Sequence, residues 1–269
     1  MSEKTLGPPL IVEHDGPIAR VTLNRPDALN TLNQALVEAL LEATATLAAD
    51  DAVRVVILRG AGKHFMAGGD LHEFATMLEH SGDQRYEQFH RMIGRLHGSI
   101  EQLARMPHPV IAGVHGAVAG FGLSLMCACD LAFAADNAYF ASAYRNIALT
   151  PDGGGTWSLP RLVGLHKAME ILLFAERFDA RQALELGLVN RVVPPQDLER
   201  SVEQAARALA SAPVEAIRGA KRLLRMSAGN SLSQQLDLEA ASFARCAASP
   251  DFAEGIRAFL EKRPPQFQR

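Results

Sequence analysis

Residues 109–129 read PVIAGVHGAVAGFGLSLMCAC, and this uncharged stretch decides the fold. It is long enough for a membrane-spanning helix, and Gly116 and Gly120 have the spacing of transmembrane helix dimers. Four glycines and His115, however, divide the stretch into a β-branched run, a glycine-rich turn and a second apolar run. This pattern favours a buried strand, a tight turn and a buried helix over a membrane span.

The same order of strand, glycine-rich loop and helix occurs earlier in the chain. A β-branched run at 53–58 precedes a glycine-rich loop at 60–69, and a helix is expected to begin near Asp70. Strands that alternate with helices in this way indicate an α/β core. The other elements expected in this part are strands at 10–14, 18–23, 109–114, 131–135 and 138–140, and a helix over 32–47.

Beyond Pro194-Pro195 the sequence indicates helices almost throughout. We expect one helix over 197–212, a second over 213–226, a third opened by a capping box at Ser231, and a fourth with Ser249 as its N-cap. The chain is therefore divided into an α/β core (1–195) and a helical domain (196–269). Faces rich in Ala and Leu in the second part predict contacts between subunits. The alternative is that these helices pack on the core of their own chain.

Composition excludes several classes of function. The formal charge of 27 − 30 = −3 provides no basic excess for nucleic-acid binding. Three cysteines cannot form a disulfide framework, and none of them lies in a CxxC pair, so no metal site is expected. The first ten residues contain no apolar signal segment, which predicts a cytoplasmic protein without a membrane partner.

Both glycine-rich loops place backbone N–H groups at the start of a helix. One loop is FMAGGD at 65–70, and the other is GAVAGFG at 116–122. Such N–H groups lack partners within the helix, and the positive end of the helix dipole adds to their attraction for an anionic oxygen. Each loop alone could be only a turn, but two that converge would form an oxyanion hole.

Other catalytic motifs do not fit these loops. Ser124 would need a glycine at Met126 to form a nucleophile elbow, and Gly62-Lys63 is not part of a phosphate-binding loop. The histidines at 64, 108 and 115 lack the short mutual spacing of metal ligands. We interpret them as loop or core residues.

Five motifs in order make the chain resemble the enoyl-CoA hydratase/isomerase (crotonase) superfamily over nearly its whole length. They are NRPDALN at 24–30, FMAGGDL at 65–71, GAVAGFG at 116–122 with Cys129-Asp130, PDGGGT at 151–156 with LPR at 159–161, and the tail from Glu254 to Pro264. The resemblance implies a ClpP/crotonase-like spiral of ββα units with a C-terminal helical domain. It also implies homotrimers or dimers of trimers, acyl-CoA substrates, and no cofactor other than the coenzyme A of the substrate.

The resemblance assigns residues to an acyl-CoA site. The two oxyanion-hole donors would be the N–H groups of Gly69 and Phe121, the latter at a position commonly occupied by glycine in the family. The loop from Arg25 to Ala28 would lie near the nucleotide end of coenzyme A. The residues expected to line its arm are Ala67, Gly69, Asp70 and Leu71. For Asp70 an N-terminal helix cap is the simpler interpretation.

Departures from the family pattern bear on the reaction. The two glutamates of a typical hydratase correspond to Ser124 and Tyr144, which have ordinary pKa values too high for activating water near pH 7. Asp152 resembles the acidic position of isomerase members, although Pro-Asp-Gly is also a common turn sequence. With Asp152 as the base, Ser124 and Tyr144 would orient the substrate.

These features predict an enzyme that isomerises an enoyl-CoA double bond of the Δ3/Δ2 type, with a cyclic or branched acyl group as one option. Asp152 would move the proton, and Gly69 and Phe121 would stabilise the thioester enolate. Two alternatives stay open: an atypical hydratase that lacks the usual glutamate pair, and a relative that binds acyl-CoA without catalysis.

Overall fold

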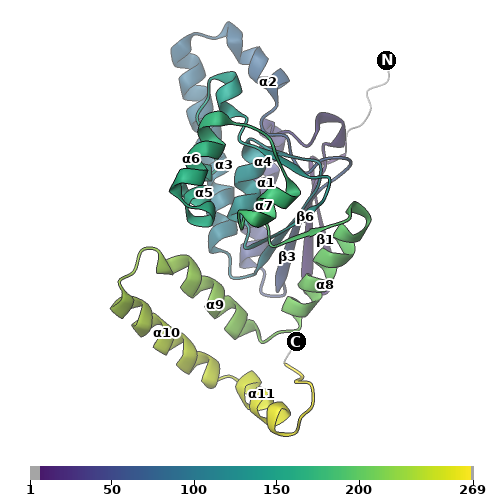
Figure 1. Ribbon diagram of the computed structural model, residues 1–269, viewed down its shortest axis with the longest axis vertical. Coiled ribbons are helices and arrows are strands. Elements are labelled where there is room, and N and C mark those ends of the chain that lie inside the picture. The colour runs from purple at the N-terminus through teal and green to yellow at the C-terminus, as the bar shows by residue number, and fades with distance from the viewer. Residues whose placement is uncertain (1–6, 268–269) are drawn as a thin grey trace.

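The computed structural model describes residues 7–267, which form two β-sheets surrounded by helices, with three further helices standing apart (Figure 1). The larger sheet has six strands in the order β1-β2-β3-β4-β6-β9, and only the β1–β2 hairpin is antiparallel. Its strands are β1 (Leu10–Asp15), β2 (Ile18–Leu23), β3 (Val55–Gly60), β4 (Val110–Val114), β6 (Leu131–Ala135) and β9 (Arg191–Val193). The smaller sheet contains β5 (Ala117–Ala119), β7 (Tyr139–Ala141) and β8 (Phe178–Asp179).

Helices connect the parallel strands and cover the sheet, as the alternating pattern predicted. They are α1 (Gln34–Ala49), α2 (Leu71–Thr76), α3 (Gly82–Arg105), α4 (Phe121–Ala128), α5 (Gly155–Val163), α6 (Leu165–Phe174), α7 (Ala180–Glu185), α8 (Leu198–Ala210), α9 (Val214–Ser227), α10 (Leu232–Ala247) and α11 (Pro250–Leu260). The expected α/β class is confirmed.

The uncharged stretch at 109–129 forms strand β4, strand β5 and helix α4, all of them in the interior. The segment between β4 and α4, expected to be only a loop, contains β5, because residues 117–119 pair with β7. Within residues 7–267 no helix is both long and apolar enough to cross a bilayer. Residues 1–6, on which the expected absence of a signal segment rests in part, lie outside the described residues.

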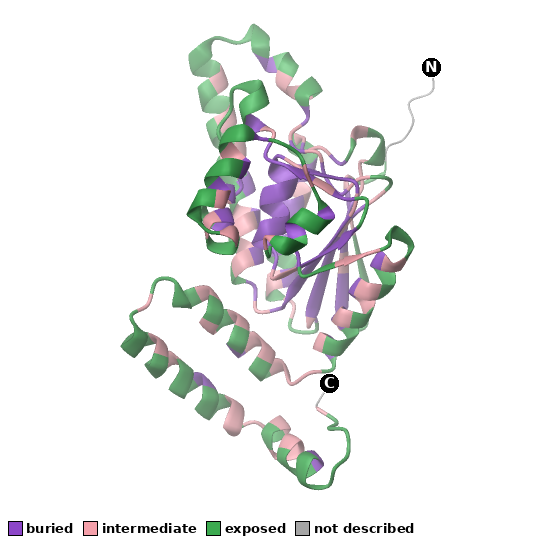
Figure 2. Cartoon of the chain, in the orientation of Figure 1, coloured by how far each residue is buried: buried purple, intermediate pink, exposed green. Residues whose placement is uncertain are grey.

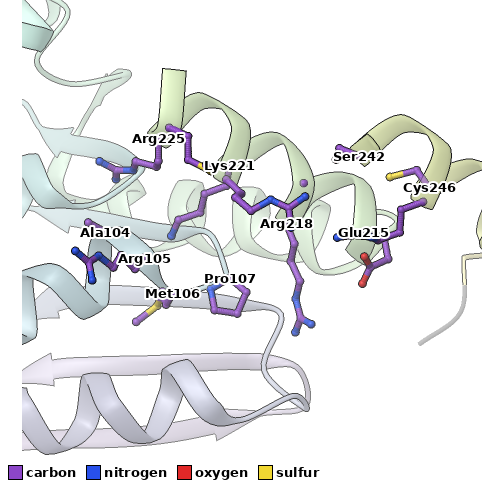
Figure 3. A pocket seen from close by; sticks show the side chains of 14 residues that line it. Ala104, Arg105, Met106, Pro107, Glu215, Arg218, Lys221, Arg225, Ser242 and Cys246 are labelled. Carbon is purple, nitrogen blue, oxygen red and sulfur yellow. The ribbon is translucent and has the colours of Figure 1, made fainter. Parts of the chain in front are cut away.

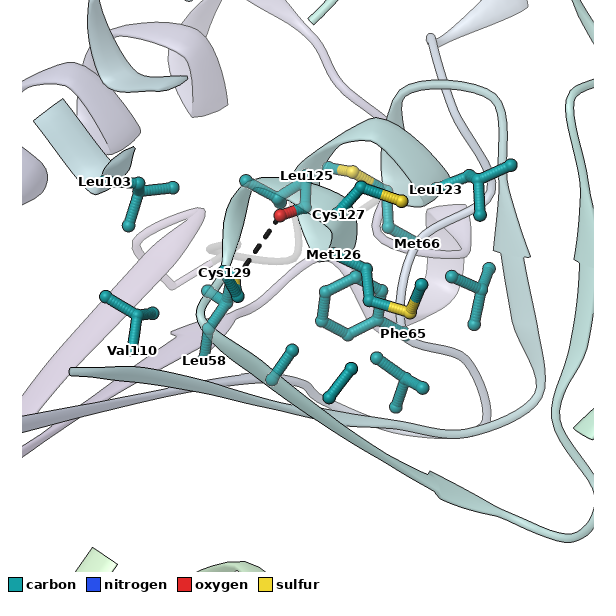
Figure 4. Close-up of a cluster of buried hydrophobic side chains, with 14 of the residues drawn as sticks. Leu58, Phe65, Met66, Leu103, Val110, Leu123, Leu125, Met126, Cys127 and Cys129 are labelled. Atoms are coloured by element: carbon teal, nitrogen blue, oxygen red, sulfur yellow. Dashed lines mark hydrogen bonds between the residues drawn. The ribbon is translucent and has the colours of Figure 1, made fainter. Parts of the chain in front are cut away.

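Side chains of α4 fill the centre of the main core (Figure 4). All eight residues of this helix are buried, so a uniformly apolar segment is stable there. Cys127 and Cys129 pack as small apolar groups, and the Cys129 thiol donates a hydrogen bond of 3.4 Å to the Leu125 carbonyl. Burial raises the pKa of the Cys127 thiol to about 12, so this thiol is neutral and unreactive.

Helix α8 covers part of the other face of the large sheet. Val202 and Ala206 on this helix share a buried cluster with Val55, Ile57 and Ile111 on the strands. The predicted division near residue 195 remains a prediction. In the structure, the helices that stand away from the sheet are α9, α10 and α11 (Figure 1).

These three helices form what we call the helical arm (residues 214–260), and most of its surface is exposed (Figure 2). The capping box at Ser231 is confirmed: its hydroxyl accepts from the Gln234 N–H at 3.3 Å and its own N–H donates to Gln234 Oε1 at 2.8 Å. Ser249 is the N-cap of α11, as expected, but its hydroxyl donates backward to the Cys246 carbonyl at 2.7 Å and caps no N–H group of the helix.

Candidate active site

The two glycine-rich loops lie against each other although about fifty residues separate them. Met66 donates its N–H to the Ala117 carbonyl at 3.0 Å, and its carbonyl accepts from the Ala119 N–H at 2.9 Å. Gly120 has a φ of +54°, and a Cβ at this position would lie 3.2 Å from the Cα of Gly68. A side chain here would therefore strain the backbone and push the loops apart.

The N–H groups of Gly69 and Phe121 emerge where these loops meet. Backbone bonds on either side of Gly69 hold it in place: the Leu32 N–H donates to the Gly68 carbonyl at 2.8 Å and the Asp70 N–H to the Leu32 carbonyl at 3.0 Å. Phe121 is the first residue of α4, where an N–H has no partner within the helix. Neither N–H donates to another atom of the described part of the chain, so both are available to a ligand. Their joint action as an oxyanion hole stays a prediction.

Asp70 caps the N-terminus of α2, as expected. Its Oδ1 accepts from the N–H groups of His72 at 3.1 Å and Glu73 at 3.4 Å, and its Oδ2 lies 2.8 Å from the Arg25 guanidinium. Partial burial tends to raise the pKa of Asp70, but Arg25 and the two N–H donors hold it below its ordinary value. Arg25 also donates to the Thr31 carbonyl. Asp70 is thus occupied by structural contacts next to Gly69.

Replacing Asp70 should separate its two structural roles. Asp70→Asn keeps a capping oxygen but loses the ion pair with Arg25, whereas Asp70→Ala loses both. We expect Asp70→Ala to lower the free energy of unfolding by about 1 to 2 kcal/mol, and Asp70→Asn to lower it less. Urea denaturation measures both values. Equal losses in the two variants would show that the cap contributes nothing.

The other residues expected near coenzyme A lie beside this corner. Ala28 ends a short 3₁₀ helix (Pro26–Ala28) and is half-buried. The Ala67 N–H donates to the Leu29 carbonyl at 3.1 Å, which joins that loop to the glycine-rich loop. Leu71 begins α2 with 54% of its surface exposed. The structure brings these residues together, and their contact with a ligand stays a prediction.

Asp152 forms the second half of the site. The Tyr144 hydroxyl donates a hydrogen bond to Asp152 Oδ1, and the Ser124 hydroxyl donates to the Asp152 backbone carbonyl at 2.9 Å. Gly153, at a φ of +58°, turns the chain so closely against Phe121 that a Cβ would lie 2.6 Å from the ring. Phe121 therefore offers its N–H to the first half of the site and its ring to the second.

The environment of Asp152 favours a proton acceptor. Burial raises the pKa of the Asp152 carboxyl, while the Tyr144 hydrogen bond and the nearby His97 oppose the rise. A carboxylate with a raised pKa is a stronger base. Burial and the adjacent charge of Asp152 also raise the pKa of Tyr144 well above its ordinary value, so Tyr144 remains a neutral hydrogen-bond donor.

Sequence reasoning missed His97. It lies on α3, and its Nε2 accepts a hydrogen bond of 3.4 Å from the Gly153 N–H. No motif surrounds His97, and only the packing of α3 beside the 151–155 turn reveals it. Two of the histidines interpreted as loop or core residues also contact the glycine-rich loops. His64 Nδ1 accepts a hydrogen bond from the Ala117 N–H at 3.0 Å, and His115 Nε2 lies 3.0 Å from the Gly62 carbonyl.

Known proteins resemble this chain over nearly all of its length. The family model for enoyl-CoA hydratase/isomerase matches residues 13–269. A Rhodobacter capsulatus protein named "Probable enoyl-CoA hydratase" is 39% identical, covering 93% of this chain and 94% of that protein. The 1,2-epoxyphenylacetyl-CoA isomerase of Escherichia coli is 36% identical, with the same coverage. The crystal structure of an enoyl-CoA hydratase from Polaromonas superposes with a TM-score of 0.90 at 36% identity, covering 96% of this chain and 99% of that one.

Proposed function

Because the chain belongs to the enoyl-CoA hydratase/isomerase family, we propose that it moves the double bond of an enoyl-CoA between the Δ3 and Δ2 positions. The observation that supports this most is a single carboxylate, Asp152, held by Tyr144 next to the loops that carry Gly69 and Phe121. A double-bond shift requires one base and a means of stabilising an enolate, and both kinds of group are present.

The reaction begins with a proton transfer to the free oxygen of Asp152. The base takes the proton from C2 of a 3-enoyl thioester, and the electron pair of that C–H bond moves toward the thioester carbonyl. The Gly69 and Phe121 N–H groups stabilise the negative oxygen of the resulting dienolate. Asp152 then returns the proton to C4, the double bond forms between C2 and C3, and the enzyme is restored without a cofactor.

Tyr144 and Ser124 position the base in this mechanism. The Tyr144 hydroxyl occupies Oδ1 of Asp152, so Oδ2 is the oxygen left for the substrate. Ser124 fixes the backbone of the same residue through the Asp152 carbonyl. A base that is held on two sides loses little freedom when it transfers a proton, which favours catalysis. Both residues therefore act through Asp152 as well as lining the site.

The atypical hydratase is the weaker candidate. Hydration needs a group that deprotonates water and a second group that protonates carbon. Among the described residues, the side chain of Asp152 is hydrogen-bonded to Tyr144, and Ser124 and Tyr144 stand where a typical hydratase has its two glutamates. The names of several relatives nevertheless include hydratases, so hydration is the reaction against which the proposal must be tested.

The acyl group we propose is cyclic or branched. A Cβ on Gly69 would lie 2.6 Å from the end of the Phe74 ring, and Phe74 meets Phe89 edge to face with centroids 5.0 Å apart. Both rings are half-buried, so they place an aromatic surface beside Gly69. Such a surface suits a ring better than a flexible chain. The E. coli relative is named for a ring-containing acyl-CoA, which agrees with this proposal.

Separate assays of the two reactions test the proposed function. Crotonyl-CoA reports hydration through loss of the conjugated enoyl absorption, and a 3-enoyl-CoA reports double-bond migration through its gain. Mass spectrometry distinguishes the products, because hydration adds the mass of water and isomerisation adds nothing. We expect migration to be much faster. Dominant hydration would overturn the proposal, and binding without either reaction across linear and cyclic substrates would favour a non-catalytic relative.

We also propose that the chain works as a homotrimer or a dimer of trimers. The helical arm carries large apolar side chains with about three quarters of their surface exposed, which is unusual for a monomer. They are Leu224, Leu232, Phe243, Phe259 and Leu260, each 74–81% exposed. Burying these side chains against other copies would remove them from water. A cytoplasmic location and the absence of any cofactor remain predictions.

Charges on this apolar surface should disrupt the assembly. Phe243→Glu combined with Phe259→Glu places two carboxylates where burial is proposed, and an unpaired buried charge is strongly unfavourable. We expect light scattering to give the mass of an oligomer for the wild-type protein and the mass of a monomer for this double variant. Glu185→Lys, on the exposed surface of α7, is the control that should leave the mass unchanged. A monomeric wild-type protein would rule the proposed assembly out.

A further inference from the structure

None of the residues that line one cavity of the molecule belongs to the candidate active site (Figure 3). This cavity has a volume of about 580 Å³ and is bounded by residues 104–107, α9 and α10. This volume is ordinary for a small-molecule site. Residues 104–107 precede the first residue of β4, whereas the glycine-rich loop of the active site follows its last residue. The cavity and the candidate active site therefore lie at opposite ends of strand β4.

The side chains that line this cavity are strongly basic. One acidic residue, Glu215, contributes to the wall, against six cations, namely Arg105, Arg218, Lys221, Arg222, Arg225 and Arg245. The helical arm provides all of them except Arg105, which ends α3 (Figure 3). So many like charges around one space repel each other, and an anion between them would relieve the repulsion.

Four of the six cations already have a carboxylate partner. Arg105 lies 3.6 Å from Glu101, Arg218 lies 3.7 Å from Asp51, and the other two share Asp130. Lys221 lies 2.6 Å and Arg225 lies 2.8 Å from the carboxylate of Asp130, whose other contacts include the Val110 N–H. These ion pairs attach α9 to the core. They leave the remaining cations of the cavity without compensation from Asp130.

Other cations have unused hydrogen-bonding capacity. Arg218 is not one of them, because its guanidinium lies against the core, 3.3 Å from the Val53 carbonyl and 3.7 Å from the Asp51 carboxylate. Arg222 and Arg245 are exposed at the cavity, and neither forms an ion pair with the described residues. An anionic oxygen in the cavity would provide an acceptor for Arg222 and Arg245.

The ionisation of neighbouring groups agrees with a positive potential here. Burial lowers the pKa of His108, and the charges of Arg218 and Lys221 lower it further. Burial likewise lowers the pKa of Lys221, and Arg225 contributes in the same direction. The neutral form of a basic side chain is favoured where positive charge is concentrated around it.

From the cavity, its six cations and the exposed Arg222 and Arg245, we propose that this space binds a small polyanion carrying phosphate or carboxylate groups. Guanidinium groups match both chemistries because they donate two parallel hydrogen bonds to paired oxygens. The bound anion would connect Arg105 of the core to Arg222 and Arg245 of the helical arm. Binding would therefore stabilise the position of the arm as well as the fold.

Calorimetric titration of the full chain with pyrophosphate and with citrate tests the proposal. Ionic strength is held constant with sodium chloride, since charge interactions at exposed arginines depend on salt. We expect saturable binding with one anion per chain, and the better ligand of the two identifies phosphate or carboxylate as the preferred group. Thermal unfolding in the same buffers should show a higher midpoint with the bound anion.

Matched double variants locate the site. Arg222→Gln with Arg245→Gln should weaken binding about tenfold or more, as expected for the loss of charge-assisted hydrogen bonds. Arg181→Gln with Arg200→Gln removes the same charge from exposed positions outside the cavity and should change nothing. The proposal is overturned if neither anion binds saturably, if both double variants weaken binding equally, or if a saturating acyl-CoA displaces the anion.

Discussion

Replacement of Asp152 by asparagine is expected to slow double-bond migration by about 10²- to 10⁴-fold, the usual contribution of a positioned general base. Asparagine has nearly the same shape and can still accept the Tyr144 hydrogen bond, so the local geometry should persist. Its amide cannot carry a proton between two carbons. Binding of a non-reacting acyl-CoA should be nearly unchanged, because Asp152 acts only in proton transfer.

The pH dependence of the wild-type rate provides a second measurement. Burial raises the pKa of Asp152, and the base is active only when ionised. The rate should therefore fall as pH decreases through this raised pKa, at a higher pH than an exposed aspartate would give. Asp136→Asn, an exposed position, is the control that should keep full activity. Turnover by Asp152→Asn at the wild-type rate would exclude Asp152 from the mechanism.

Much of this fold could be predicted because the sequence changes character at each element. The β-branched run at 110–114 and the glycines after it indicated a buried strand and a turn, and both are present. The three residues of β5 were missed, because their pairing with β7 is a tertiary contact that no local pattern encodes. Ser249 was correctly indicated as the N-cap of α11, but nothing in the sequence indicated that its hydroxyl donates to the Cys246 carbonyl.

The candidate site shows the same division. Glycine-rich loops before helices indicated where N–H donors would lie, since helix termini have predictable unsatisfied groups. Two other contacts depend on packing between distant segments. The Phe121 ring lies against Gly153, and His97 accepts a hydrogen bond from the Gly153 N–H. Tyr144 was indicated only as a substrate-orienting residue, and its hydrogen bond to Asp152 required the structure.

The second large effect is expected from removing one backbone donor. Phe121→Pro eliminates the N–H at the first position of α4, where proline fits the helix without breaking a hydrogen bond. Because this change also deletes the ring, Phe121→Ala is the matched reference, which lacks the ring and keeps the N–H. We expect kcat of the proline variant to be about 10²- to 10³-fold below that of the alanine variant, as for loss of one oxyanion-hole donor.

This comparison is informative because stability and catalysis are affected by different atoms of one residue. Both variants lose a buried aromatic side chain and should be destabilised by about 3 to 5 kcal/mol, which thermal unfolding measures. Only the proline variant loses the hydrogen bond to the enolate oxygen, and that bond strengthens as negative charge develops. Its effect should therefore fall on kcat, with KM nearly equal in the two variants. Equal kcat values in two folded variants would mean that the thioester oxygen is stabilised elsewhere.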